Sequence, residues 1–345
     1  MRPARAVLTI AFALAAMLVL ALGACGKTTV VREPSVVVTS GEAGSGAPQP
    51  PREAAGVRIA VVTHGQASSP FWAIVRNGVE AAARQMDVVV DYRAPDVYSV
   101  ARMTTLIDQA VATRPDGLVV SIPEPAVAPA IRRATRSGIP VVSINSGAEV
   151  YRRLGVLAHV GQPEDRAGLQ AGRRLAAAGV RRALCVNQQV GATALDERCR
   201  GLARAMRRAG GTARVLGVDD ENPATPRRIA AAIAAGRIDG VLALNSTSGM
   251  EAVEAAGRLR RRAGRLRIAT FDLGPDVLAA VRARKLLFAV DQQAYLQGYL
   301  PIVLLAQRIR YGLFPAQGDV IPTGPNFVTA ATAAKAIELS KRSIR

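Results

Sequence analysis

The chain has 345 residues, of which half are hydrophobic and 4% aromatic, and 45 Lys and Arg against 26 Asp and Glu give it a formal net charge of +19. This apolar content excludes a disordered chain, and the length suits one large or two ordinary domains that each bury a core. Two His and three Cys argue against a zinc site of the usual His/Cys type, so we expect no metal and no cofactor.

The first residues have the pattern of an export signal. Two arginines precede an uncharged apolar run over residues 6–22, which is slightly short for a membrane span. The run ends in Leu-Gly-Ala-Cys, which resembles the bacterial lipobox, with Cys25 as its last residue. The resemblance implies cleavage of a lipoprotein signal peptide, residues 1–24, and lipidation of Cys25. An ordinary signal peptide with an incidental cysteine is the alternative.

Residues 25–56 are expected to form the lipidated N-terminus and a flexible linker. Residues 41–51 read GEAGSGAPQPP and have no periodic apolar face, although the run Val36–Val38 could also be a strand. A net charge of +19 raises nucleic acid and anionic membranes as partners. An exported, tethered protein does not meet chromosomal DNA, so we expect no nucleic acid partner and membrane attachment through the lipid on Cys25.

From residue 57 onward, short apolar runs alternate with helical patterns. In the first half, strands are predicted at residues 57–62, 88–92, 117–122 and 139–144. Helices are predicted between them, at residues 71–85, 100–112 and 126–137. Apolar strands that alternate with helices indicate right-handed βαβ units and a mainly parallel sheet.

The same rhythm restarts after Val160. Strands are predicted at residues 182–186, 213–218, 240–244 and 267–271, and helices at residues 165–178, 196–209, 226–235 and 249–262. Two sets of about four strands predict two doubly wound α/β domains rather than one long sheet. Neither a G-x-G-x-x-G after the first strand nor a Walker phosphate loop is present, so nucleotide binding is unsupported.

The loop after the first strand contains aromatic residues that are scarce elsewhere. Ser69 precedes Pro70, Phe71 and Trp72, the only tryptophan of the chain, at the predicted start of a helix. Ligands of open α/β sheets bind beyond the carboxyl ends of the strands, and flat apolar rings stack on the C–H face of a sugar. The alternative is a hydrophobic staple that fixes the helix entry.

Amide and carboxylate side chains follow several other strands. The predicted strand ends carry Asn145, Asn245, Asp272 and Gln292, and Arg198 lies early in a predicted helix. Each sugar hydroxyl both donates and accepts, so planar amides and carboxylates suit a neutral polyol. Local turn capping by Asn and Asp is the alternative at each single position, and the repetition across both halves favours binding.

Eight segments together carry a resemblance to a known family. They are SPFW at 69–72, PDGLVVSIP at 115–123, GIPVVSINS at 138–146, HVGQ at 159–162, AGLQAGRRLA at 167–176, ERCRG at 197–201, TFD at 270–272 and VDQQ at 290–293. Residues 57 to about 325 resemble the ribose- and galactose-type sugar-binding proteins of ABC importers, the type I periplasmic binding proteins. Related repressors need an N-terminal helix-turn-helix, where this chain has the lipobox and linker.

The resemblance implies two lobes joined by a three-segment hinge. The first lobe would comprise residues 57–161 and 293–322, and the second residues 162–292 and 323–345. It also implies a ligand set of Ser69, Phe71, Trp72, Asn145, Gln162, Arg198, Asn245, Phe271, Asp272 and Gln292. Here Ser69 replaces an amide, Asn145 and Ser146 replace an Asp and an Arg, and Ile122 replaces an Asn of the ribose binders. These departures count against ribose itself and leave a neutral monosaccharide or sugar alcohol.

The implied function is capture of this sugar in a cleft between the lobes and delivery to the permease of an ABC importer, by a monomer. A sensor that presents a sugar or furanosyl signal to a chemoreceptor or kinase is the alternative. An enzyme is not expected, since His64, Asp272 and Asp291 form no recognisable catalytic spacing and a fold alone does not imply activity.

Two cysteines remain after Cys25. Cys185 ends a predicted strand and Cys199 lies on the next helix, beside Arg198. Outside the cytoplasm such a pair can oxidise, and we predict a disulfide that fixes this helix to the sheet. Two buried free thiols are the alternative.

Overall fold

The computed structural model describes residues 56–65, 69–259, 266–314, 318–342 and 344. The predictions for the signal peptide, for Cys25 and for most of the linker lie outside these residues. Within them, the chain forms two α/β lobes, each built on one sheet of six strands. The predicted fold class, two doubly wound domains of mainly parallel sheet, is confirmed.

The sheet of the first lobe has the order β11-β5-β4-β3-β1-β2, and all neighbouring strands are parallel. Its strands are β1 (Arg58–Val62), β2 (Val89–Arg93), β3 (Gly117–Ser121), β4 (Val141–Ile144), β5 (Ala158–Gly161) and β11 (Val320–Pro322). Alternate residues of β1 face opposite sides: Ile59 and Val61 join one core cluster, while Ala60 and Val62 join the other. Both faces are therefore buried, as the continuous apolar run predicts.

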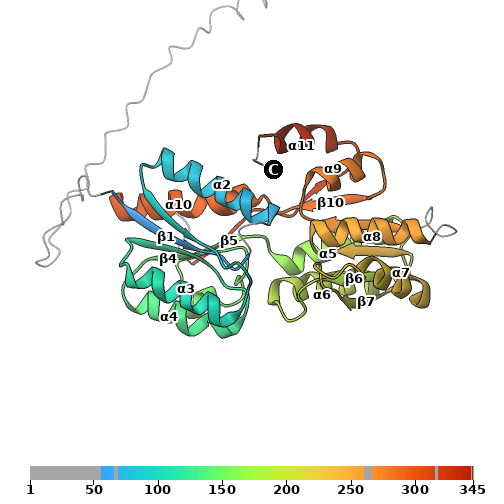
Figure 1. Cartoon of the computed structure of the whole chain (residues 1–345), viewed down its shortest axis with the longest axis horizontal. Helices are drawn as coiled ribbons and strands as arrows, with labels where there is room; N and C mark the ends of the chain where they lie inside the picture. Colours follow the sequence, from blue (N-terminus) through green and yellow to red (C-terminus); the bar gives the residue numbers. More distant parts are fainter. Residues whose placement is uncertain (1–55, 66–68, 260–265, 315–317, 343, 345) are drawn as a thin grey trace, which may run out of the picture. The chain divides into compact units, whose positions relative to one another are not determined.

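Helices cover both faces of this sheet. They are α2 (Pro70–Gln85), α3 (Val100–Ala112), α4 (Ala128–Arg136) and α10 (Ala294–Tyr311). Figure 1 shows α2 and α10 side by side on one face and α3 and α4 on the other. Residues of α2 at helical spacing, Val75, Val79 and Ala82, pack with Ile302 and Leu305 of α10. A segment more than 200 residues downstream thus completes the first lobe.

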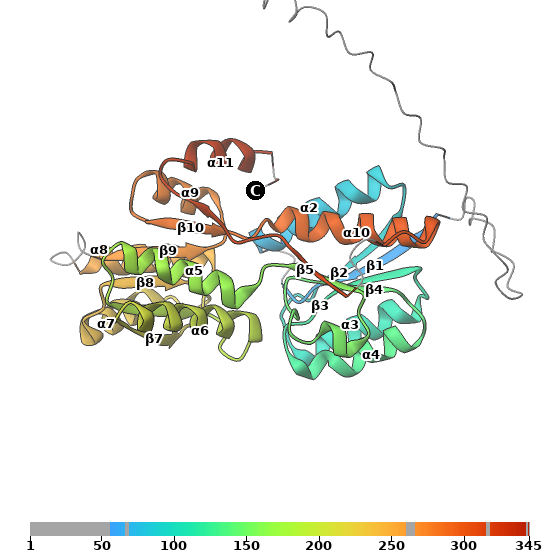
Figure 2. The ribbon, with the colours of Figure 1, turned by 180° about the vertical axis from the view of Figure 1, so that it is seen from behind.

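The sheet of the second lobe has the order β12-β10-β9-β8-β6-β7, with only β12 antiparallel to its neighbour. Its strands are β6 (Arg182–Asn187), β7 (Thr212–Gly217), β8 (Gly240–Ala243), β9 (Arg267–Phe271), β10 (Phe288–Asp291) and β12 (Asn326–Val328). Its helices are α5 (Glu164–Ala177), α6 (Thr193–Arg208), α7 (Thr225–Gly236), α8 (Ser246–Arg258), α9 (Pro275–Arg282) and α11 (Ala333–Ser340). Figure 2 shows α5 and α6 together on one side of the second sheet.

Among the described elements, the chain passes between the two sheets three times. It crosses after β5 into α5, after β10 into α10, and from β11 to β12. All three crossings lie at the carboxyl ends of strands β5, β10 and β11. Each sheet has six strands instead of the predicted four or so: β5 and β11 complete the first sheet, and β12 together with β10, the strand expected before Gln292, completes the second. β11 and β12 have only three residues each, too few to show a period.

Candidate ligand-binding site

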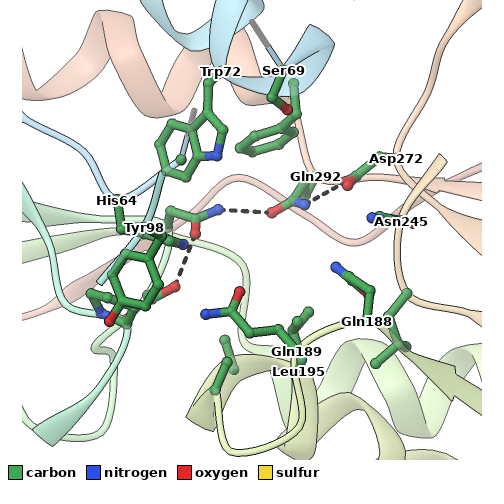
Figure 3. A pocket seen from close by; sticks show the side chains of 18 of the residues that line it. His64, Ser69, Trp72, Tyr98, Gln188, Gln189, Leu195, Asn245, Asp272 and Gln292 are labelled. Atoms are coloured by element: carbon green, nitrogen blue, oxygen red, sulfur yellow. Dashed lines mark hydrogen bonds between the residues drawn. The ribbon is translucent and has the colours of Figure 1, made fainter. Parts of the chain in front are cut away.

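A cavity of about 290 Å³ lies where the carboxyl ends of both sheets meet. Eight of the predicted ligand residues line it: Ser69, Phe71, Trp72, Asn145, Arg198, Asn245, Asp272 and Gln292. Figure 3 shows Trp72 and Tyr98 on one side of the cavity and Gln188 and Gln189 on the other. Residues that are distant in sequence therefore converge on one space from both lobes.

The same strand-end turn presents a polar side chain in each lobe. Asn145 follows β4 and Asp272 follows β9, and both have left-handed backbones, with φ of 61° and 65°. Asn and Asp tolerate this conformation better than other residues with a Cβ. The backbone N–H of Asn145 donates to Val160 O at 3.1 Å, and that of Asp272 donates to Val290 O at 2.9 Å. The neighbouring strand thus fixes each turn, and the side chain is free to reach the cavity.

The aromatic residues of the first loop serve two purposes. Ser69 is the N-cap residue of α2, and Pro70, Phe71 and Trp72 form its first turn. Trp72 is 7% exposed and packs in the core with Val75, while its ring also lines the cavity. The centroids of the Phe71 and Trp72 rings are 5.2 Å apart, edge to face. A hydrophobic staple joins residues at N′ and N4, whereas Phe71 and Trp72 are at N2 and N3 of α2, so Trp72 contributes to the core and to the cavity wall rather than to a staple.

Arg198 is held by a carboxylate that the sequence did not single out. Its Nε donates to Glu164 Oε2 at 2.6 Å and its Nη2 donates to Glu164 Oε1 at 2.8 Å, and both residues are 3% exposed. Burial disfavours the charged guanidinium, but the adjacent Glu164 carboxylate outweighs it and raises the pKa of Arg198. Nη1 also donates to Leu244 O at 3.1 Å. The guanidinium is thus fixed in one orientation at the cavity wall.

Close helix packing brings Glu164 and Arg198 together. A Cβ on Gly168 of α5 would overlap the carbonyl oxygen of Arg198, and a Cβ on Gly201 of α6 would overlap that of Asp165. The two helices can approach this closely only because both positions are glycine. Helix α6 begins at Thr193, three residues before the predicted start, so Arg198 lies in its second turn.

Side chains from two of the crossings form one buried network with the cavity wall. Asn145 Nδ2 donates to Gln297 Oε1 at 3.2 Å, and Gln297 Nε2 donates to Thr323 Oγ1 at 3.2 Å. Gln292 Nε2 donates to Asp272 Oδ1 at 2.5 Å. These bonds connect the second and third crossings with ligand candidates of both lobes.

Asn245 both caps a helix and lines the cavity, the two roles that the sequence indicated for it. Its Oδ1 accepts the backbone N–H of Ser248 at 2.8 Å and so caps α8, while its Nδ2 donates to Asp220. Both Asn245 and Asp220 line the cavity. Capping therefore does not remove this side chain from the site.

Two predicted ligand residues do not reach the cavity wall among the described residues. Gln162 is fully buried, and its Nε2 donates to Glu164 Oε2 at 2.8 Å. Phe271 is also fully buried, and the Cζ of Arg198 lies 4.3 Å from its ring centroid. Their contacts instead support the Glu164–Arg198 pair, through a hydrogen bond and a cation–π interaction.

The wall also contains residues that the sequence did not assign to the ligand. The main ones are His64, Tyr98, Gln188, Gln189 and Asp220. All of them follow strands β1, β2, β6 and β7 at the carboxyl edge. Reading every strand end, including those of the outer strands β2 and β7, would have found them.

The carboxyl group of Asp272 has a raised pKa. Burial raises its pKa to about 6, while the nearby Arg198 and the hydrogen bond from Gln292 act in the opposite direction. A carboxyl group that titrates near neutrality and faces a cavity is a candidate for a ligand contact.

The structure joins Cys185 of β6 to Cys199 of α6 by a disulfide with an S–S distance of 2.07 Å. Cys199 directly follows Arg198, so this bond ties the helix that carries the guanidinium to the sheet. Among the described residues no cluster of three or more His, Cys, Asp or Glu could hold a metal ion. In the same part of the chain, no helix is both long and apolar enough to cross a membrane.

Comparison with known proteins identifies the family. Residues 59–312 match the family described as periplasmic binding protein domain. The solved structure of a carbohydrate transporter from Acidothermus cellulolyticus 11B, in complex with myo-inositol, is 34% identical, with a TM-score of 0.78 over 84% of this chain and 100% of that one.

More distant solved structures share the fold. A periplasmic sugar-binding protein from Legionella pneumophila is 23% identical, with a TM-score of 0.71 over 77% of this chain and 99% of that one. A solute-binding protein from Burkholderia graminis C4D1M, in complex with D-arabinose, is 21% identical, with a TM-score of 0.72 over 80% and 96%. A search of curated proteins gives no match. The chain belongs to the periplasmic binding protein family, whose members bind solutes outside the cytoplasm and are not enzymes.

Proposed function

We propose that the protein captures a neutral monosaccharide or sugar alcohol for an ABC importer. The observation that carries this proposal is the cavity itself, in which the ring of Trp72 lies near the amide and carboxylate groups of Asn145, Asn245, Asp272 and Gln292. An aromatic face suits the C–H side of a sugar ring, and the planar polar groups suit its hydroxyls. The most similar of the structures described above holds myo-inositol, a ligand of this class.

The size of the cavity supports a single sugar ring. Its volume of about 290 Å³ lies at the small end of ligand pockets, which range from about 300 to 1,000 Å³. Capture would involve closure of the lobes about the three crossings. We assign residues 57–161 and 293–322 to one lobe and residues 162–292 and 323–345 to the other, consistent with the sheet that each strand joins.

Calorimetry tests the ligand class directly. The purified full chain would be titrated with myo-inositol, D-arabinose, D-tagatose, D-ribose and D-galactose. At least one of them should bind with a sub-millimolar dissociation constant. Native mass spectrometry of protein from its own host would show a retained sugar. The absence of heat with every sugar, together with an empty cavity in the native protein, would contradict the proposal.

Membrane attachment is the second part of the proposal. Cleavage before Cys25 and lipidation of its thiol would hold the protein, as a monomer, beside the permease on the extracytoplasmic side. Labelled palmitate should enter the unaltered protein and not a Cys25→Ser variant. Labelling of both, or of neither, would contradict a lipid anchor at this residue.

Sensing is the alternative use of the same ligand capture. The bound sugar or furanosyl signal would then be presented to a chemoreceptor or sensor kinase. Uptake of the labelled sugar by a strain that lacks the protein separates the two. Lost uptake supports transport, whereas normal uptake with a lost behavioural or kinase response supports sensing.

A further inference from the structure

His64 lines the cavity, although its sequence position indicated only a polar loop residue. Its ring centroid is 4.9 Å from that of Trp72 and 5.8 Å from that of Tyr98, edge-on to both. Burial lowers the pKa of His64 to about 4, so the imidazole is neutral at physiological pH. A neutral imidazole has one N–H donor and one bare nitrogen, and their arrangement decides what the ring can bind.

Ser121, the last residue of β3, fixes this arrangement. Its hydroxyl oxygen accepts the backbone N–H of His64 at 2.9 Å and lies 2.8 Å from His64 Nδ1. Ser121 is fully buried, and among the described residues Nδ1 is the only acceptor for its hydroxyl hydrogen. The hydroxyl therefore donates to Nδ1, because its hydrogen would otherwise be buried without a partner. This hydrogen bond network assigns the imidazole proton to Nε2.

The Nε2–H of His64 is then a donor without a protein partner among the described residues. Nε2 is separated from Nδ1 by Cε1, so its N–H points away from Ser121, and Nε2 is not among the fully buried atoms that lack a partner. Nε2 therefore keeps accessible surface, on a ring that lines the cavity. His159 differs, because its Nε2 is buried as well as unpartnered.

We propose that His64 donates a hydrogen bond from Nε2 to a hydroxyl or ring oxygen of the bound sugar, with Ser121 as the positioning residue for its ring. This inference rests on the proposed function and adds a specificity-determining contact to it. A hydroxyl or ring oxygen has lone pairs that can accept from Nε2–H, whereas a protonated amine has none.

The tautomer can be measured without a ligand. The chain has only two histidines, so a long-range ¹H–¹⁵N spectrum of the full chain shows two rings, and His64→Phe identifies one of them. The His64 ring should show a protonated Nε2 and a bare Nδ1 at pH 7. In Ser121→Ala, the Nδ1 signal should move toward the average of the two tautomers. A protonated Nδ1 in the unaltered protein would overturn the proposal.

The contribution of the contact is measured as a change in sugar affinity. The sugar used is the one of the panel that the unaltered protein binds most tightly, and myo-inositol is tested first. His64→Phe keeps the ring edges and loses the donor, so affinity should fall about tenfold. His64→Gln keeps a donor and an acceptor for Ser121, so affinity should stay within about threefold. If Ser121 acts through His64, then Ser121→Ala should weaken binding alone but not further in the His64→Phe background.

The outcomes separate this inference from the function on which it rests. Sugar binding by the unaltered protein, with equal affinity in His64→Phe, would overturn the contact and leave the proposed function standing. Additive effects of His64→Phe and Ser121→Ala would overturn the role of Ser121. No binding of any panel sugar by the unaltered protein would overturn both the function and the contact.

Discussion

The two walls of the cavity differ in how they hold their polar groups. The described first-lobe wall is built from the rings of His64, Phe71, Trp72 and Tyr98, and it contains no ionised side chain at neutral pH. The second-lobe wall carries Arg198, Asp220 and Asp272 in addition to its amides. One wall therefore offers flat faces and neutral donors, and the other offers charges.

The two walls also differ in the interactions that position their side chains. His64 and Asn145 are positioned by neutral hydrogen bonds to a serine and to glutamines, whereas Arg198 depends on the buried carboxylate of Glu164. A buried charge is costly unless its partner is present, so the second wall should be the more fragile of the two.

Removal of the buried carboxylate should have the largest effect. Glu164→Gln leaves the Arg198 guanidinium buried without its counter-charge and should lower the free energy of unfolding by about 3–5 kcal/mol. Urea unfolding measures the loss. The double variant Glu164→Gln, Arg198→Met removes the unpaired charge and should recover part of it.

An exposed pair provides the matched control. Arg133 Nη2 lies 2.8 Å from Asp108 Oδ2 in the first lobe, but these side chains are 51% and 45% exposed. Asp108→Asn should therefore cost less than about 1 kcal/mol. Equal losses in Glu164→Gln and Asp108→Asn would show that burial of the pair does not matter.

Reduction of the disulfide should lower the stability of the second lobe alone. The bond between Cys185 and Cys199 spans 14 residues, and a loop of that length corresponds to about 3 kcal/mol of unfolding free energy. Thermal unfolding with and without reductant measures the effect. Cys185→Ala, Cys199→Ala should unfold like the reduced protein and be insensitive to reductant. A reductant effect in this variant would show that another group is responsible.

Much of the site could be predicted because it follows strand ends. Asn145, Asn245 and Asp272 come directly after apolar runs, and parallel strands bring such positions to one edge. The alternation of strands and helices was equally readable, because both faces of each sheet are covered and the strands are continuously apolar.

The contacts that hold Arg198 in the second-lobe wall could not be predicted from the sequence in the same way. Glu164 and Arg198 are 34 positions apart, and they meet only because α5 and α6 pack closely at Gly168 and Gly201. Periodicity shows which face of a helix is buried, but not which residue of another helix it meets. Tyr98 was missed for a similar reason, since it follows the outer strand β2, far from any recognised motif.

Removal of the Trp72 ring tests the contribution of the first-lobe wall to sugar binding. Trp72→Leu keeps an apolar side chain in the core and removes the ring that lines the cavity. Sugar affinity should fall roughly 30-fold, or about 2 kcal/mol. Since Trp72 is the only tryptophan, its fluorescence reports sugar binding in the unaltered protein, and calorimetry reports it in the variant. An unchanged affinity would show that the sugar binds to the second wall only.

The pH dependence of affinity tests the second wall with the smallest expected change. Asp272 has a pKa of about 6, and sugar hydroxyls that donate to it require the carboxylate, so protons compete with the sugar. Affinity should be nearly constant above pH 7 and should be about tenfold lower at pH 5, which is 1.4 kcal/mol. Over the same range His64, with a pKa of about 4, stays largely neutral and the first wall does not change its charge.

Asp272→Asn is the control for this titration. Glu197 and Glu251 do not line the described cavity, but burial raises the pKa of each to about 7, and they titrate in the same window. If Asp272 is responsible, Asp272→Asn binds the sugar more weakly at pH 7 and with little dependence on pH. If Asp272→Asn still loses affinity tenfold between pH 7 and pH 5, the loss belongs to those glutamates. The charge of the second-lobe wall would then not control sugar affinity.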